Sequence, residues 1–230
     1  MKATLLTDGI TPKKNGRRFA IGDIHGNYET FNELLHKIKL SKNDALFLLG
    51  DYIDKGPDSK RVLNLIMHLQ QKYNVQPILA NHEFMFLLAY YDLDYYKIWK
   101  QKYGKETLIS FGVKHIRDIP QKYFLWIKSL PLVVQSDNFI LSHAGVNFSL
   151  PDPFEPEPVN RMNILFQFDA KPDKTRQFRS IIGHHSHTVA QCKRSATSNL
   201  IYCDAGCGKK NGSLVAYCLD DDSIVAVKQR

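Results

Sequence analysis

Polar clusters that combine glycine, aspartate and histidine recur in the first half of the chain, each directly after a short apolar run. Gly22-Asp23-Ile24-His25-Gly26 comes first, followed by Gly50-Asp51-Tyr52-Ile53-Asp54-Lys55-Gly56 and then by Asn81-His82-Glu83. Carboxylate, imidazole and amide groups held together can bind a pair of divalent metal ions, and metal pairs suit chemistry on phosphate esters. The clusters therefore predict a metal-dependent phosphoesterase.

The apolar runs before these clusters are typical of buried strands. They cover residues 19–21, 45–49 and 75–79, and helical spacing of apolar residues lies between them at 28–39 and 59–72. Strand-helix-strand units of this kind normally have parallel strands joined by right-handed crossovers. Ligands bind such sheets outside the carboxyl ends of the strands. We therefore expect the three polar clusters to meet at one edge of a sheet.

The second half of the chain has a different pattern. Helical spacing at 83–102 and 121–129 gives way to strand-like runs at 132–135, 139–142, 181–182, 200–204, 214–219 and 224–227. The proline-rich piece 151–158 cannot form a helix or a central strand, so we expect a surface loop there. Together these patterns predict one α/β domain over residues 1–230, in which two facing β-sheets are flanked by helices.

Composition excludes several other classes of protein. The chain of 230 residues is 43% hydrophobic and 23% charged, with a net charge of +8. Its only dense basic cluster, at 13–18, is short, so we expect a solvated surface and no specific nucleic-acid binding. No apolar run is long enough to cross a membrane, and the N-terminus does not resemble a signal peptide. We expect a cytoplasmic monomer with four reduced cysteines.

Two later clusters complete the set: Leu141-Ser142-His143-Ala144-Gly145 and Ile182-Gly183-His184-His185-Ser186-His187. In this order the five clusters resemble the calcineurin-like metallophosphoesterases, and within them the phosphoprotein serine/threonine phosphatase branch in its bacterial or phage form. Glu106-Thr107-Leu108-Ile109-Ser110-Phe111-Gly112 is similar to a Thr-Leu-x-Ser-Tyr-Gly segment of bacterial members. The resemblance implies that family's fold, with two mixed sheets between layers of helices.

The resemblance also implies a role for each ligand candidate. Asp23 and His25 would bind the first metal ion, Asp51 would bridge both ions, and Asn81, His143 and His184 would complete the second site. His185 and His187 lie close by, so the last assignment could slip along the chain, although Gly183-His184 fits the family spacing best. Mixed nitrogen and oxygen donors favour manganese, with an iron–zinc pair or nickel as alternatives.

The same resemblance supplies a mechanism. It implies that a hydroxide shared by the two metal ions attacks phosphorus while His82, oriented by Asp54, protonates the leaving group. A carboxylate beside an imidazole favours the protonated ring, which suits a general acid. The expected activity is phosphomonoester hydrolysis at phosphoserine or phosphothreonine of a phosphorylated protein partner, with small phosphate esters as further substrates.

Departures from the family pattern put the phosphate-binding groups in question. Lys55 stands where the family usually has arginine, and Leu79-Ala80 stand where it has Arg-Gly. A Trp-x-Arg-like segment is replaced by residues 165–168. Lysine offers a point charge instead of a planar fork. Lys55 remains our candidate substrate-binding residue, and possible substitutes for the missing arginines are Arg161, Arg176, Arg179 and Lys171.

Two alternative functions stay open. The first is hydrolysis of dinucleoside polyphosphates or phosphodiesters by an enzyme of the same fold. Glu83 favours the phosphatase branch instead, because the dinucleotide branch resembles Asn-His-Asp at this place. The second alternative is a phosphate-binding protein without catalysis, which has no need for a proton donor such as His82 beside the metal ions.

Overall fold

The computed structural model describes residues 5–175 and 177–230. Its six-stranded sheet contains, in spatial order, β11 (Ile224–Lys228), β10 (Ser213–Cys218), β2 (Arg18–Ile21), β3 (Ala45–Leu48) and β4 (Asn74–Pro77), with β9 (Asp204–Ala205) paired to β10. The five-stranded sheet contains β1 (Leu6–Asp8), β5 (Val133–Ser136), β6 (Phe139–Ser142), β7 (Arg179–Ile182) and β8 (Leu200–Tyr202). Both sheets mix parallel and antiparallel pairs.

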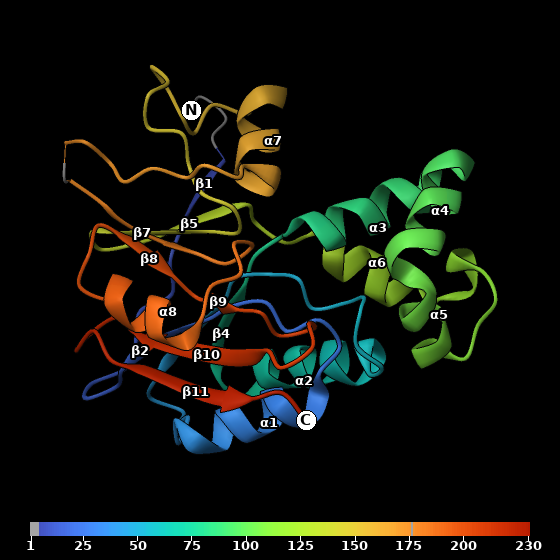
Figure 1. Cartoon of the computed structure of the whole chain (residues 1–230), viewed down its shortest axis with the longest axis horizontal. Helices are drawn as coiled ribbons and strands as arrows, with labels where there is room; N and C mark the ends of the chain where they lie inside the picture. Colours follow the sequence, from blue (N-terminus) through green and yellow to red (C-terminus); the bar gives the residue numbers. More distant parts are fainter. Residues whose placement is uncertain (1–4, 176) are drawn as a thin grey trace.

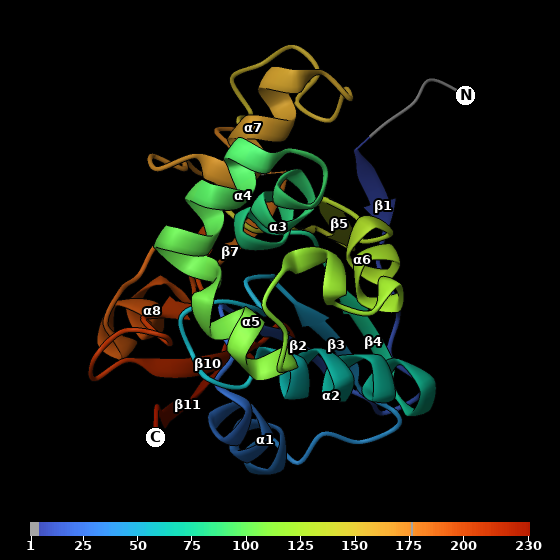
Figure 2. The same cartoon turned by 90° about the vertical axis from the view of Figure 1, so that its right-hand side faces the viewer.

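Helices surround the two sheets (Figure 1). They are α1 (Tyr28–Lys37), α2 (Ser59–Lys72), α3 (Asn81–Tyr91), α4 (Leu93–Trp99), the π-helical η1 (Lys100–Gly104), α5 (Lys105–Phe111), the 3-10 turn η2 (Ile116–Asp118), α6 (Gln121–Lys128), α7 (Pro158–Phe166) and α8 (Val189–Ser195). Figure 2 shows α1 and α2 below the six-stranded sheet and α7 at the opposite end of the molecule. None of the helices in the described ranges is long and apolar enough to cross a membrane.

Apolar side chains from both sheets fill the space between them. Phe47 lies in β3 of the six-stranded sheet, and Leu49 comes directly after that strand. Leu141 and Ile181 belong to the five-stranded sheet. All four side chains are fully buried in one cluster. Burying a side chain of this size stabilises a protein by about 1.5–3 kcal/mol. The predicted arrangement of two facing mixed sheets flanked by helices is therefore confirmed, and this packing fixes the strand ends that carry the polar clusters.

The helix predicted over 83–102 is divided in the structure. α3 ends at Tyr91, and the Asp92 carboxylate then accepts hydrogen bonds from the N–H groups of Asp94 and Tyr95, at 2.8 and 3.0 Å, which starts α4. Apolar residues continue across the break at helical spacing, so periodicity alone does not detect it. α3 also begins at Asn81, so this ligand candidate lies in the first turn of a helix and not at a strand end.

Tyr52 ties together the ends of β3 and β4. Its buried hydroxyl lies 2.9 Å from the carbonyl oxygen of Leu48 and 2.8 Å from that of Ile78, and it accepts the Ile78 N–H at 3.0 Å. The chain leaves these two strand ends toward Asp51 and Asn81. The hydroxyl therefore holds in register two of the segments that carry ligand candidates.

We expect Tyr52→Phe to lower the free energy of unfolding by about 1–3 kcal/mol, because the Ile78 carbonyl oxygen loses the buried hydroxyl that bonds to it, while the Ile78 N–H keeps its bond to the Leu48 carbonyl oxygen. Urea denaturation measures the change. Tyr91→Phe is the matched control, since Tyr91 is 64% exposed, and it should change stability by less than about 0.5 kcal/mol. Equal stabilities of the two variants would show that the Tyr52 hydroxyl does not stabilise this junction.

Candidate metal centre

The loops after β2, β3, β6 and β7 and the first turn of α3 meet at one edge of the two sheets. This arrangement brings together the six ligand candidates Asp23, His25, Asp51, Asn81, His143 and His184. All of them except His184 are buried. Two clusters of ligand atoms result, one with His25, Asp51 and His82 and one with Asp23, Asp51 and His143, so the Asp51 carboxylate belongs to both. The Asp23 carboxylate lies between them, 3.9 Å from His25 Nε2 and 4.0 Å from His143 Nδ1.

The first cluster lies around His25. Its Nδ1 is 3.1 Å from the carbonyl oxygen of Ile53, which can only accept, so Nδ1 carries the proton and Nε2 has a free lone pair. Nε2 lies 3.3 Å from Asp51 Oδ2 and 3.9 Å from Asp23 Oδ2. The ammonium of Lys55 lies 2.6 Å from the same Nε2. A positive charge already stands where the donor atoms converge.

The second cluster lies around His143. Its Nδ1 donates to the carbonyl oxygen of Leu49 at 2.9 Å, which leaves a lone pair on Nε2. That Nε2 faces Asn81 Oδ1 at 2.8 Å, His184 Nδ1 at 3.1 Å and Asp51 Oδ1 at 3.5 Å. A lone pair on Nε2 directed at a carbonyl oxygen repels it unless a cation lies between them. Nε2 of His184 also has no hydrogen-bond partner among the described residues. This donor set fits a metal ion.

The electrostatics of the site point the same way. Burial, reinforced by Asp204 and Asp51, raises the pKa of Asp23 well above its usual value. Burial also lowers the pKa of His143, and burial together with His143 lowers the pKa of His184 to about 3. Crowded carboxylates need a positive counter-charge, and neutral imidazoles are the form that binds metals.

The backbone is strained at five of these positions. His25, Asp51, Asp54, Lys55 and His184 have φ angles of 45°, 51°, 68°, 64° and 58°. Residues other than glycine rarely adopt this left-handed backbone conformation, and those that do are often found at functional sites. Five of the ten non-glycine residues with positive φ in the described ranges therefore lie at this site, and the others are Asn15, Lys39, Asp137, Asn211 and Asp222.

Glu83 holds the loop that carries Asp51. One oxygen of this fully buried carboxylate accepts the Asp51 N–H at 2.9 Å, and the other accepts the N–H groups of Tyr52 and Ile53 at 2.8 and 3.3 Å. Burial and the negative charge of Asp51 raise the pKa of Glu83 to about 8. The glutamate thus has a structural role beside the sequence interpretation that it marks the phosphatase branch.

His82, whose ring belongs to the cluster around His25, forms a pair with Asp54. His82 Nδ1 lies 2.7 Å from Asp54 Oδ2, and His82 Nε2 lies 3.9 Å from Asp51 Oδ2. Burial lowers the pKa of His82, but the charge of Asp51 and the bond to Asp54 outweigh it, so the pKa is raised overall. The Thr107 hydroxyl donates to Asp54 Oδ1 at 2.6 Å, and the Trp99 indole N–H donates to Asp54 Oδ2 at 3.1 Å.

Trp99 and Gly104 were missed from the sequence. Trp99 belongs to a run of aromatic residues that predicts packing, yet its indole N–H reaches Asp54. A Cβ on Gly104 would lie 2.3 Å from the Trp99 ring, so only glycine allows this placement. Gly104 ends the π-helical turn η1, and such turns are frequent at functional sites. The hydrogen bond from Thr107 to Asp54 could have been suspected from the sequence, because Thr107 belongs to the Thr-Leu segment that resembles bacterial family members.

The neighbouring histidines take other positions. His185 Nε2 lies 2.7 Å from the carbonyl oxygen of Gln167. The His187 ring packs against Tyr202, with a centroid distance of 3.9 Å. Neither belongs to the two donor clusters, so among the three histidines the structure favours His184.

The possible arginine substitutes lie in different places. Arg179 is held by the Asp222 carboxylate and the Ala196 carbonyl oxygen, at 2.9 and 2.6 Å, away from the donor clusters. Arg161 is exposed on α7, and Arg176 falls outside the described residues. Lys171 lines a cavity next to the histidine loop.

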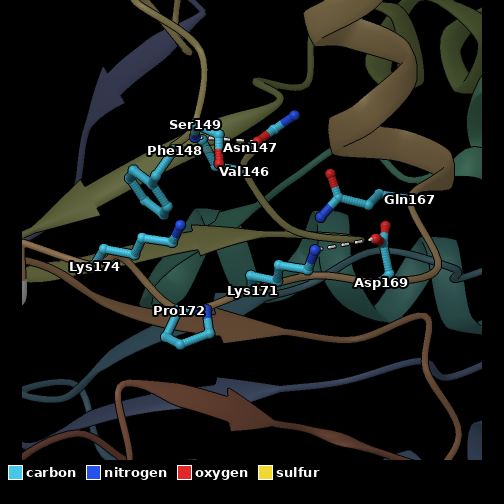
Figure 3. A pocket seen from close by; sticks show the side chains of 9 residues that line it. All are labelled: Val146, Asn147, Phe148, Ser149, Gln167, Asp169, Lys171, Pro172 and Lys174. Carbon is cyan, nitrogen blue, oxygen red and sulfur yellow. Dashed lines mark hydrogen bonds and ion pairs between the residues drawn. The ribbon is translucent and has the colours of Figure 1, made fainter.

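This cavity, which we call the polar pocket, has a volume of about 440 Å³ (Figure 3). Its lining consists of Val146, Asn147, Phe148, Ser149, Gln167, Asp169, Lys171, Pro172 and Lys174. Lys171 pairs with Asp169 at 3.7 Å, and both side chains are mostly exposed. The Gln167 carbonyl oxygen lies 2.7 Å from His185 Nε2, so the polar pocket adjoins the loop after β7 that also carries His184.

Comparisons with known proteins agree with this geometry. The model of the calcineurin-like phosphoesterase family matches residues 17–217. A solved structure provisionally called a diadenosine tetraphosphatase has a TM-score of 0.66 at 22% identity, and the alignment covers 99% of both chains. At that identity the likeness concerns the fold alone.

Curated relatives match shorter stretches. The symmetrical bis(5'-nucleosyl)-tetraphosphatase of Wigglesworthia glossinidia brevipalpis is 35% identical over 131 residues, which are 56% of this chain and 44% of the relative. The zinc-dependent endopolyphosphatase of Saccharomyces cerevisiae is 41% identical over 96 residues, 41% of this chain and 28% of the relative. The chain thus spans less than half the length of either relative.

We expect the protein to bind two manganese ions per chain and Asp51→Asn to weaken their binding by about a hundredfold or more, since both donor clusters lose a charged ligand. Equilibrium dialysis followed by elemental analysis measures this. Asp94→Asn is the control, because Asp94 pairs with Lys97 on the surface. Unchanged metal content in Asp51→Asn would rule out a bridging role for this carboxylate.

Proposed function

Because the chain belongs to the calcineurin-like phosphoesterase family, we propose that it hydrolyses phosphoanhydride bonds and that its substrates are dinucleoside polyphosphates. The names of the two curated relatives support this choice, since both describe cleavage within a chain of linked phosphates. We thus prefer the dinucleoside polyphosphate alternative to the hydrolysis of phosphoserine and phosphothreonine that the motifs led us to expect.

The observation that carries the proposal is a set of separate lysines. Lys55 reaches His25, and Lys171 and Lys174 line the polar pocket, which adjoins the loop that carries His184. An arginine fork grips one phosphate through two bonds, whereas lysines offer separate point charges. Separate charges suit an extended anionic chain better than a single phosphate.

We propose that Asp23, His25 and Asp51 would hold one metal ion and that Asp51, Asn81, His143 and His184 would hold the other. When bound, two divalent ions neutralise phosphoryl oxygens and lower the pKa of water. A metal ion on His25 Nε2 would displace the Lys55 ammonium from that nitrogen, and the displaced ammonium would then hold a substrate phosphate next to the ion.

His82 would give its proton to the oxygen of the leaving group. Its Nδ1 is fixed by Asp54, so the proton to be transferred stays on Nε2, the nitrogen that faces the donor clusters. Trp99 and Thr107 each donate to Asp54 and hold it in place. The charge of Asp51 and the bond to Asp54 raise the pKa of His82, a direction that favours the protonated ring that a general acid requires.

The first test compares substrates. With manganese added to metal-stripped protein, we expect kcat/KM for diadenosine tetraphosphate to exceed that for a phosphoserine peptide by at least about tenfold, and ADP to be the product, as symmetrical cleavage requires. Anion-exchange chromatography and a phosphate assay measure the two reactions. Asp51→Asn is the inactive control. Turnover of the phosphopeptide alone would overturn the proposal in favour of the phosphatase branch.

The second test uses the leaving group. We expect His82→Asn to lower turnover of a phosphoserine peptide or another alkyl ester by about two to four orders of magnitude, the usual span for a lost general acid. The loss on diadenosine tetraphosphate should be smaller, because a phosphate oxygen has a pKa near 6 and leaves with little help. Metal content should stay unchanged. Full activity of His82→Asn on both substrates would contradict its role as the proton donor.

A further inference from the structure

A second cavity lies between α3, α4, η1 and α7. We call it the apolar pocket; its volume is about 430 Å³. Its lining consists of Phe84, Met85, Leu88, Tyr95, Ile98, Trp99, Tyr103, Met162 and Phe166. Figure 2 shows α7 next to α3 and α4, the helices that contribute most of these residues. Phe166 lines the apolar pocket and the next residue, Gln167, lines the polar one, so the end of α7 separates the two.

The apolar pocket is open to a ligand. Tyr95 and Ile98 are each 51% exposed and Met162 is 47% exposed, although all three belong to the lining. Apolar side chains gathered around a hollow leave water in contact with apolar surface, which is unfavourable until another apolar group displaces it. Such a hollow is a common form of small-molecule site.

Two lining residues connect the apolar pocket to the proton donor. The Tyr103 ring meets the His82 ring edge to face, with centroids 5.0 Å apart. The Trp99 indole donates to Asp54 at 3.1 Å, and Asp54 in turn holds His82. A group in this pocket therefore lies on the side of His82, where the leaving group departs.

The uncharged, apolar lining of this pocket suits the base of a nucleotide better than its phosphates. None of the lining residues carries a charge, so a phosphate would lose its hydration without compensation. The partly exposed aromatic rings of Phe84 and Tyr103 instead stack with planar rings, whereas Trp99 is only 2% exposed and forms the closed wall behind them. Bases stack on aromatic side chains with a contribution of about 1–3 kcal/mol per base. The Tyr95 hydroxyl at the rim adds a group that can bond to the edge of a base.

We propose that the apolar pocket binds the nucleobase of the leaving nucleotide, while the lysines of the polar pocket and Lys55 bind phosphates. This inference rests on the proposed function and makes it more specific. The protein recognises a base on the leaving side, next to the group that protonates the departing oxygen. A bare polyphosphate chain lacks this contact.

Binding of two matched probes tests the inference without turnover. ADP and inorganic pyrophosphate share a diphosphate and differ in the nucleoside. Titration calorimetry with manganese-loaded protein should give an affinity for ADP at least about tenfold higher than for pyrophosphate. The double variant Ile98→Asn with Met162→Asn should lose most of this preference, because it makes two apolar walls polar without adding charge.

The control changes the same helices outside the pocket. Leu93 on α4 is 63% exposed and Val159 on α7 is 58% exposed, and neither lines the apolar pocket. Leu93→Asn with Val159→Asn should keep the preference for ADP. Since all four substituted side chains are about half exposed or more, we expect both double variants to fold, and circular dichroism checks this.

Each outcome has a definite meaning. Loss of the ADP preference in the pocket variant alone supports the inference. An equal preference in both variants, or none in the unmodified protein, overturns it. Tighter binding of a leucine-containing phosphopeptide that depends on Ile98 and Met162 would also overturn it, because the pocket would then hold an apolar side chain. A pocket-dependent ADP preference without hydrolysis of diadenosine tetraphosphate would reject the proposed function and keep the binding site.

Discussion

The placement of the Asp51 carboxylate constrains the rest of the site. The carbonyl oxygen of Asp51 accepts the N–H groups of Ile24 and His25 at 3.0 and 2.7 Å. Its own N–H is bound by Glu83 and its side chain accepts the His82 N–H at 3.3 Å. One residue thereby joins the loop after β2, the loop after β3 and the first turn of α3. Both donor clusters depend on this junction.

The convergence of the ligand candidates could be predicted because short local sequence patterns indicate where each strand ends. Continuous apolar runs end directly before Asp23 and Asp51, and the carboxyl ends of neighbouring parallel strands must meet. Two facing sheets followed from the change of pattern after residue 132. The roles of the individual residues as ligands or acids stay predictions, since convergence alone does not assign chemistry.

The walls around the centre could not be predicted. Trp99 and Tyr103 are set by the capped break at Asp92 and by a π-helical turn that needs Gly104, and neither shows in apolar periodicity. α7 follows the proline-rich segment, where the sequence indicates only a loop. The sequence therefore predicts the substrate less well than the metal ligands, because substrate choice depends on how separate helices pack around η1 and α7 and not on a motif.

The left-handed backbone at His25, Asp51, Asp54, Lys55 and His184 links ion binding to folding. Each such residue raises the free energy of the chain by about 1–3 kcal/mol, which the surrounding structure must offset. Under the proposed metal assignment, the fold would have imposed these angles before an ion arrives, and the donors would need little reorganisation. A substitution that loosens the packing between the sheets would then weaken ion affinity without touching a ligand. Folding stability and ion affinity would in that case be thermodynamically coupled through the backbone of these five residues.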